Sequence, residues 1–91
     1  MYFKKQNLAS LHYSWIGRDE HIYRGDPSRR IFDRNNGYQV LFIINVCASF
    51  TDLFLQQDGN LIEQKIQKEL PDEVKSEKSV LNWLKEKVFA F

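Results

Sequence analysis

The stretch YQVLFIINVCASFTDLF at residues 38–54 decides the fold class, because it is the longest mainly apolar part of the chain. Its pattern is compatible with a buried strand or with a helix that is buried all round. The stretch contains no Gly or Pro and is longer than an ordinary strand. Asp33, Asn35 and Asn36 lie just upstream, and all three are good helix N-caps. We therefore predict a central core helix over residues 38–54.

Asn45 is a polar residue in the middle of this apolar run. A buried amide without partners costs about 1–3 kcal/mol. We therefore expect Asn45 to hydrogen-bond to a hairpin backbone group, to a second subunit or to ordered water, and in the first case to fix how the hairpin docks.

A second helix is predicted downstream of the turn residues Asp58-Gly59. Asn60 and Glu63 have the spacing of a capping box, so the helix is predicted to begin at Asn60. Pro71 is predicted to end it. Its predicted apolar stripe consists of Leu61, Ile62, Ile66 and Leu70.

A third helix is predicted after Ser76, which can act as its N-cap. Its apolar residues recur at spacings of three and four: Val80, Leu81, Leu84, Val88 and Phe91. Acidic residues gather near its start, at Asp72, Glu73 and Glu77, and we interpret them as complementing the helix dipole.

The N-terminal part of the chain predicts a β hairpin. Apolar and polar residues alternate over residues 11–16, which places Leu11, Tyr13 and Trp15 on one face of a strand. Residues 17–20 supply turn chemistry, and residues 21–23 are rich in strand formers. The predicted fold is a single α+β domain over residues 1–91, with an N-terminal β hairpin packed on about three α-helices.

Composition indicates a small globular protein and selects no partner. The chain has 91 residues, 43% of them hydrophobic and 27% charged, with a net charge of +1. Its single cysteine cannot form an intramolecular disulfide, and the first residues lack the apolar core of a signal peptide. The longest apolar run, residues 40–50, is too short to span a bilayer. We predict a cytoplasmic protein without a membrane partner.

The arginines form the least ordinary feature of the chain. All five lie within seventeen residues: Arg18, Arg24, Arg29, Arg30 and Arg34. A guanidinium grips carboxylate or phosphate with paired hydrogen bonds, and Tyr13, Trp15 and Tyr23 could add stacking surfaces. The competing interpretation is that acids in the same window tie these arginines to irregular loops: Asp19, Glu20, Asp26 and Asp33.

The last helix carries more apolar surface than one stripe requires, because Trp83 and Phe89 fall off its main face. One interpretation is that they form a second surface, used for self-association or for binding a partner. The other is that a small bundle packs around both faces of its last helix.

No arrangement of residues predicts catalysis or metal binding. Cys47 lies in the most apolar stretch, where a thiol is usually an inert core residue, and His12 and His21 lack metal-ligand spacing. The four glycines are too far apart for a phosphate loop. We predict no catalytic residue, no cofactor and no metal.

We therefore predict a non-enzymatic protein-interaction or adaptor module whose partner is another protein, and which forms a homodimer. The alternative is binding of single-stranded RNA or DNA through residues 18–34. The predicted partner-binding residues are Trp15, Arg18, Tyr23, Arg24, Arg29, Arg30, Trp83 and Phe89.

Overall fold

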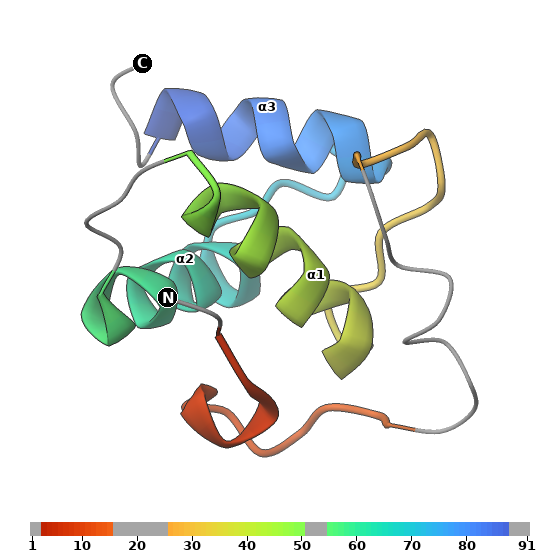
Figure 1. The fold of residues 1–91 in the computed structure, drawn as a ribbon. Coiled ribbons are helices and arrows are strands. Elements are labelled where there is room, and N and C mark those ends of the chain that lie inside the picture. The colour runs from red at the N-terminus through yellow and green to blue at the C-terminus, as the bar shows by residue number, and fades with distance from the viewer. Residues whose placement is uncertain (1–2, 16–25, 51–54, 88–91) are drawn as a thin grey trace.

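Three α-helices make up the body of the molecule in a computed structural model that describes residues 3–15, 26–50 and 55–87 (Figure 1). They are α1 (Gly37–Ala48), α2 (Gln56–Lys68) and α3 (Glu77–Lys87), and a 3-10 turn, η1 (Lys5–Asn7), precedes them. Helix α1 packs against both α2 and α3. The N-terminal segment, residues 3–15, lies across the end of the molecule away from α3 (Figure 1).

Helix α1 confirms that the apolar stretch is helical. The Asn36 side chain caps it by accepting hydrogen bonds from the Tyr38 and Gln39 backbone N–H groups, at 3.1 and 3.4 Å. The helix ends at Ala48, earlier than predicted, and Ser49 and Phe50 form a turn. The rest of the predicted helix, residues 51–54, lies outside the described part of the chain.

The core is built from the apolar faces of the three helices, from Phe3, Leu8 and Tyr13 of the N-terminal segment, and from Phe32 and Leu70. The described residues of the predicted stripes of α2 and α3 are buried, except that Leu61 is 43% exposed. Val88 and Phe91 of the predicted α3 stripe lie outside the described residues. The helical members of the core are Val40, Ile43, Ile44, Cys47, Ala48, Ile62, Ile66, Val80, Leu81 and Leu84.

The predicted start of the second helix is wrong. Helix α2 begins at Gln56, so Asp58-Gly59 lies inside it, and Asp58 Oδ2 accepts a hydrogen bond from the Leu55 N–H at 2.9 Å. Gly59 is needed for packing and not for a turn, because a Cβ atom there would overlap the buried Phe3 ring. The start of α3 is as predicted, since Ser76 Oγ accepts a hydrogen bond from the Ser79 N–H at 3.1 Å.

The predicted α+β class and its β hairpin are also wrong. Residues 3–15, 26–50 and 55–87 contain no β-strand, only isolated bridges between Ser14 and Asn36 and between Ile31 and Ser76. The alternating residues 11–15 do not pair with any strand in the described part of the chain. The Ala9 and Ser10 N–H groups before them donate to the Glu63 side chain on α2, and the Ser14 N–H donates to the Asn35 carbonyl in the loop before α1. The predicted second strand, residues 21–23, lies outside the described residues. The described fold is a small, mostly helical globule.

Asn45 anchors the N-terminal segment on α1. Its side chain accepts from the Phe3 N–H at 2.6 Å and donates to the Phe3 carbonyl at 2.9 Å and the Leu41 carbonyl at 3.0 Å. The expected bond to backbone is present, although Phe3 lies before the predicted hairpin.

Candidate functional site

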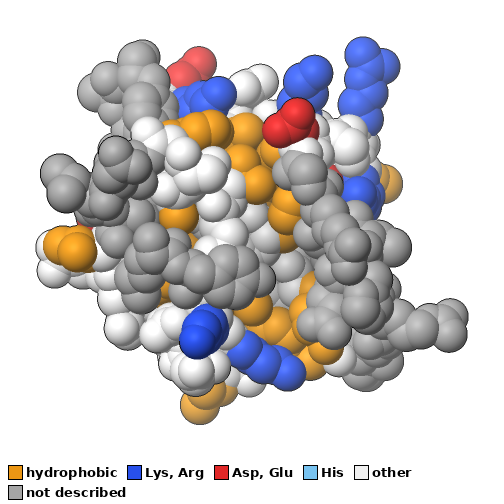
Figure 2. All heavy atoms as spheres, viewed as in Figure 1, with side chains coloured by type: hydrophobic (Ala, Val, Ile, Leu, Met, Phe, Trp, Pro, Cys, Tyr) orange, Lys and Arg blue, Asp and Glu red, His pale blue; other side chains and the backbone are white. Residues whose placement is uncertain are grey.

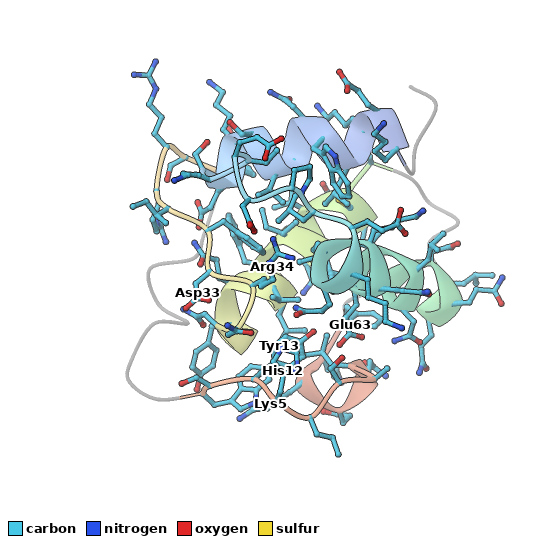
Figure 3. The ribbon with its side chains drawn as sticks, turned by 180° about the vertical axis from the view of Figure 1, so that it is seen from behind. Lys5, His12, Tyr13, Asp33, Arg34 and Glu63 are labelled. Carbon is cyan, nitrogen blue, oxygen red and sulfur yellow. The ribbon has the colours of Figure 1, made fainter. Side chains whose placement is uncertain are left out.

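A buried carboxylate on α2 holds the N-terminal segment. Glu63 is 2% exposed, and its two oxygens accept hydrogen bonds from the Ala9 N–H at 2.8 Å, the Ser10 N–H at 3.1 Å and the Tyr13 hydroxyl at 2.6 Å. Figure 3 shows Glu63 above Tyr13 and His12. Burial, followed by the Glu63 carboxylate, raises the pKa of Tyr13, so this hydroxyl stays protonated and donates to Glu63.

A second buried carboxylate, Glu77 at the start of α3, holds the segment that precedes α1. It is fully buried and accepts hydrogen bonds from the Ser28 N–H at 3.1 Å, the Ser28 hydroxyl at 3.2 Å and Gln39 Nε2 at 2.8 Å. Arg30 Nη1 lies 3.7 Å from Glu77 Oε2, the oxygen that also accepts the hydrogen bond from Gln39. The position at the helix start suits the dipole, as interpreted from the sequence, but Glu77 also connects three parts of the chain.

Residues 30–33 are fixed along both edges. On one side, the Phe32 N–H donates to the Lys75 carbonyl at 2.7 Å, and the Glu77 N–H donates to the Arg30 carbonyl at 2.9 Å. On the other side, the Gln39 amide donates to the Ile31 carbonyl at 2.9 Å and accepts from the Asp33 N–H at 2.7 Å. The Gln39 side chain therefore takes the place of a neighbouring strand.

This fixed segment presents an exposed apolar side chain beside a hollow of about 330 Å³. Ile31 is 76% exposed, whereas Phe32 and Leu70 are buried beneath. We call this surface the Ile31 face. Its lining residues are Ile31, Phe32, Asp33, Arg34, Asn35, Leu70, Asp72, Val74 and Lys75.

The described arginines differ in how far they are engaged within the molecule. Arg34 donates to the Leu70 carbonyl at 2.7 Å and the Gln67 carbonyl at 3.4 Å, and lies 3.7 Å from Asp72. Arg30 is half-buried beside Glu77, and Arg29 is exposed. The other two predicted contact residues of the cluster, Arg18 and Arg24, lie outside the described residues.

Two of the four predicted aromatic contact residues, Trp15 and Trp83, lie in the described part of the chain. Trp15 is half-buried against Gly37, with Tyr38 edge-on at 5.0 Å and Lys5 Nζ 4.3 Å from its ring centroid. Trp83 is half-buried and packs on the core, as the wrapped-bundle interpretation expects. Tyr23 and Phe89 lie outside the described residues, so the predicted self-association surface stays a prediction.

The thiol and the described imidazole lie in different environments. Cys47 is fully buried, and burial raises its pKa from 9.0 to about 12, whereas His12 is exposed and stacks on Tyr13 with centroids 4.4 Å apart. The described residues bring together no group of three or more His, Cys, Asp or Glu side chains that could hold a metal ion.

The raised pKa values predict that stability falls at alkaline pH. Between pH 9 and 12 the Cys47 thiol ionises in the unfolded chain but not in the folded one, so the unfolded state binds fewer protons and folding weakens. Each such group adds a slope of about 1.4 kcal/mol per pH unit. We expect urea unfolding at pH 8, 9, 10 and 11 to show that the free energy of unfolding falls less steeply with pH in Cys47→Ala than in the wild type, by about 1 kcal/mol per pH unit. Identical slopes for the two proteins would contradict this assignment.

Sequence reasoning missed the three buried polar residues that organise this site, namely Gln39, Glu63 and Glu77. One signal was present for Glu63: it lies four residues after Gly59 and three before Ile66, so it falls on the buried face of α2. Glu77 carries the same kind of signal, because it lies three residues before Val80 and four before Leu81, and Gln39 lies four residues before Ile43. The sequence does not show their partners, because Ile31 lies 8 positions from Gln39 and Ser28 lies 49 positions from Glu77.

The chain matches no protein family, no curated protein and no solved structure. Among the described helices, none is both long enough and apolar enough to cross a membrane.

Proposed function

We propose that the protein is a non-enzymatic interaction module that binds another protein through the Ile31 face. The observation that carries the proposal is the 76% exposure of Ile31 on a backbone whose two edges are both hydrogen-bonded. Single exposed apolar side chains are common on protein surfaces. Ile31 differs because its backbone is fixed and a hollow lies beside it.

The physical chemistry of this face suits a protein partner. Burying one isoleucine contributes about 1.5–3 kcal/mol, and a fixed backbone loses little entropy on binding. Charged side chains of both signs surround it, with Asp33, Asp72 and Lys75 exposed. An apolar centre with a polar rim is the usual anatomy of such interfaces.

The test is a quantitative capture of partners from the cells that express the protein, using the wild type, Ile31→Asp and Leu61→Asp. Leu61 is the matched control, because it is an exposed apolar residue at 43% on α2 that does not line the hollow. We expect Ile31→Asp to reduce the amount of specific partner protein recovered at least tenfold, because burying an unpaired carboxylate in the interface costs several kcal/mol. Equal recovery with both variants would refute the proposal.

The alternative, binding of single-stranded nucleic acid through residues 18–34, is supported by the exposed side chain of Arg29. The protein partner is favoured because Arg34 is already engaged by the Gln67 and Leu70 carbonyls. A salt titration of a labelled oligonucleotide separates the two, because phosphate contacts make affinity fall steeply with salt.

A further inference from the structure

A second surface, away from the Ile31 face, combines an exposed leucine with basic side chains. Leu11 is 96% exposed, and Lys4, Lys5 and His12 are also exposed. Residues 3–15 contain no Asp or Glu. Figure 2 shows basic and apolar side chains at the lower end of the molecule, with no acidic side chain of a described residue beside them. We call this surface the Leu11 face.

A hollow of about 250 Å³ is lined on one side by Ala9 and Ser10, the two residues that precede Leu11 in the chain. Its α2 side supplies polar groups and one more cation: Asn60, Glu63, Gln64, Gln67 and Lys68. The carboxylate among them does not offset the positive charge at the surface, because Glu63 is 2% exposed and already accepts three hydrogen bonds. The hollow therefore extends the basic and polar character of the Leu11 face onto α2.

The backbone that carries Leu11 is held on both sides. Before it, the Ala9 and Ser10 N–H groups bond to Glu63. After it, the Ser14 N–H donates to the Asn35 carbonyl at 2.8 Å, and the Gly37 N–H donates to the Ser14 carbonyl at 3.0 Å. The leucine is thus presented at a fixed place, so a partner would not have to order this backbone.

The aromatic side chains beside the Leu11 face argue against single-stranded nucleic acid as its ligand. Stacking needs an open ring face, but the Lys5 ammonium lies 4.3 Å from the Trp15 centroid, and Tyr13 is only 7% exposed. Leu11, the most exposed large apolar residue described, offers no stacking surface to a base. A protein surface can supply both an apolar socket and carboxylates.

We infer that the Leu11 face binds an acidic protein segment that places apolar side chains around Leu11 and carboxylates near Lys4, Lys5 and Lys68. This site is separate from the Ile31 face and does not depend on it. With both faces occupied, the protein would join two partners, as an adaptor does.

The test uses the full ¹⁵N-labelled chain and a synthetic 18-residue peptide of Glu, Leu and Ala, with its Glu→Gln counterpart as the uncharged control. We expect amide shifts centred on Leu11, His12 and Lys68, and affinity at least tenfold weaker for the Gln peptide. Leu11→Ser and the double variant Lys4→Glu, Lys68→Glu should each weaken binding of the acidic peptide at least fivefold. All three positions are exposed, so these variants are expected to fold.

Two controls separate this inference from the proposed function. Ile31→Asp should leave the affinity for the acidic peptide unchanged, whereas Leu11→Ser should leave the binding of partners to the Ile31 face unchanged. Equal affinity for the two peptides, shifts centred elsewhere, or no shifts at millimolar peptide would overturn the inference. Tighter binding of oligouridylate or of phosphatidylserine vesicles than of the acidic peptide would also overturn it.

Discussion

Replacing Glu77 by alanine is expected to lower the free energy of unfolding by about 3–5 kcal/mol, which is a large fraction of the total for a domain of this size. Glu77 is fully buried and satisfies donors from Ser28 and Gln39, with Arg30 also beside it. Alanine removes the acceptor that the Ser28 and Gln39 donors share and leaves a cavity where the buried carboxylate was. Urea unfolding at pH 7, followed by circular dichroism, measures the loss.

Two companion variants show whether the lost hydrogen bonds are the cause. Glu86→Ala removes an exposed carboxylate from the same helix and should change stability by less than about 0.5 kcal/mol. Glu77→Gln keeps the shape but turns one acceptor into a donor that faces other donors, so it should cost about 2 kcal/mol. A loss below about 1 kcal/mol for Glu77→Ala would show that these bonds do not hold residues 28–33 in place.

Replacing Gly59 by alanine is expected to destabilise the protein by about 2 kcal/mol, although Gly59 lies inside a helix. Helix propensity alone predicts a gain of about 1 kcal/mol from this change. The structure predicts the opposite sign because the added methyl group overlaps the ring of Phe3, which is fully buried. The ring has little room to move, since the Phe3 backbone is bonded to Asn45.

A double-mutant cycle in urea unfolding tests this packing directly. In a Phe3→Ala background the obstacle is gone, so Gly59→Ala should then stabilise the protein by about 1 kcal/mol. Gln64→Ala, at an exposed position of the same helix, serves as the control and should change stability by less than about 0.5 kcal/mol. The same effect of Gly59→Ala in both backgrounds would contradict the contact.

The helices could be predicted because their signals are local. The Asn36 and Ser76 caps and the stripe around Val80, Leu81 and Leu84 depend on residues a few positions apart, and all are as expected. The prediction of where α2 begins was wrong because the deciding contact is not local. Asp58-Gly59 is a good turn by local chemistry, but this glycine is required by Phe3, which lies 56 positions earlier in the chain.

The hairpin failed because alternation over residues 11–15 does not say what the backbone will bond to. Tyr13 is indeed buried, but Leu11, predicted to share its face, is 96% exposed. The backbone donors of Ala9 and Ser10 are taken by Glu63 on α2, and Ser14 pairs beside Asn36. A strand pattern can therefore describe an extended segment that helix side chains hold in place.

The candidate surfaces were only partly accessible from the sequence. Clustered arginines pointed to a region that includes the Ile31 face, but nothing local shows that Arg34 is engaged by α2 carbonyls and Ile31 is not covered. The Leu11 face was not predicted, because the alternating pattern places Leu11 on the same strand face as Tyr13 and Trp15 and does not show which of the three is exposed. Exposure depends on tertiary packing, which a periodic pattern does not specify.

Each buried carboxylate and its hydrogen-bond donors are also synthesised at different times, because they lie far apart in the sequence. Ala9 and Glu63 are 54 positions apart, and Ser28 and Glu77 are 49. Because translation proceeds from the N-terminus, residues 9–13 are synthesised before Glu63 is added to the chain, and Ser28 is synthesised before Glu77. Residues 9–13 and Ser28 therefore have to wait for these hydrogen bonds until α2 and α3 have been synthesised.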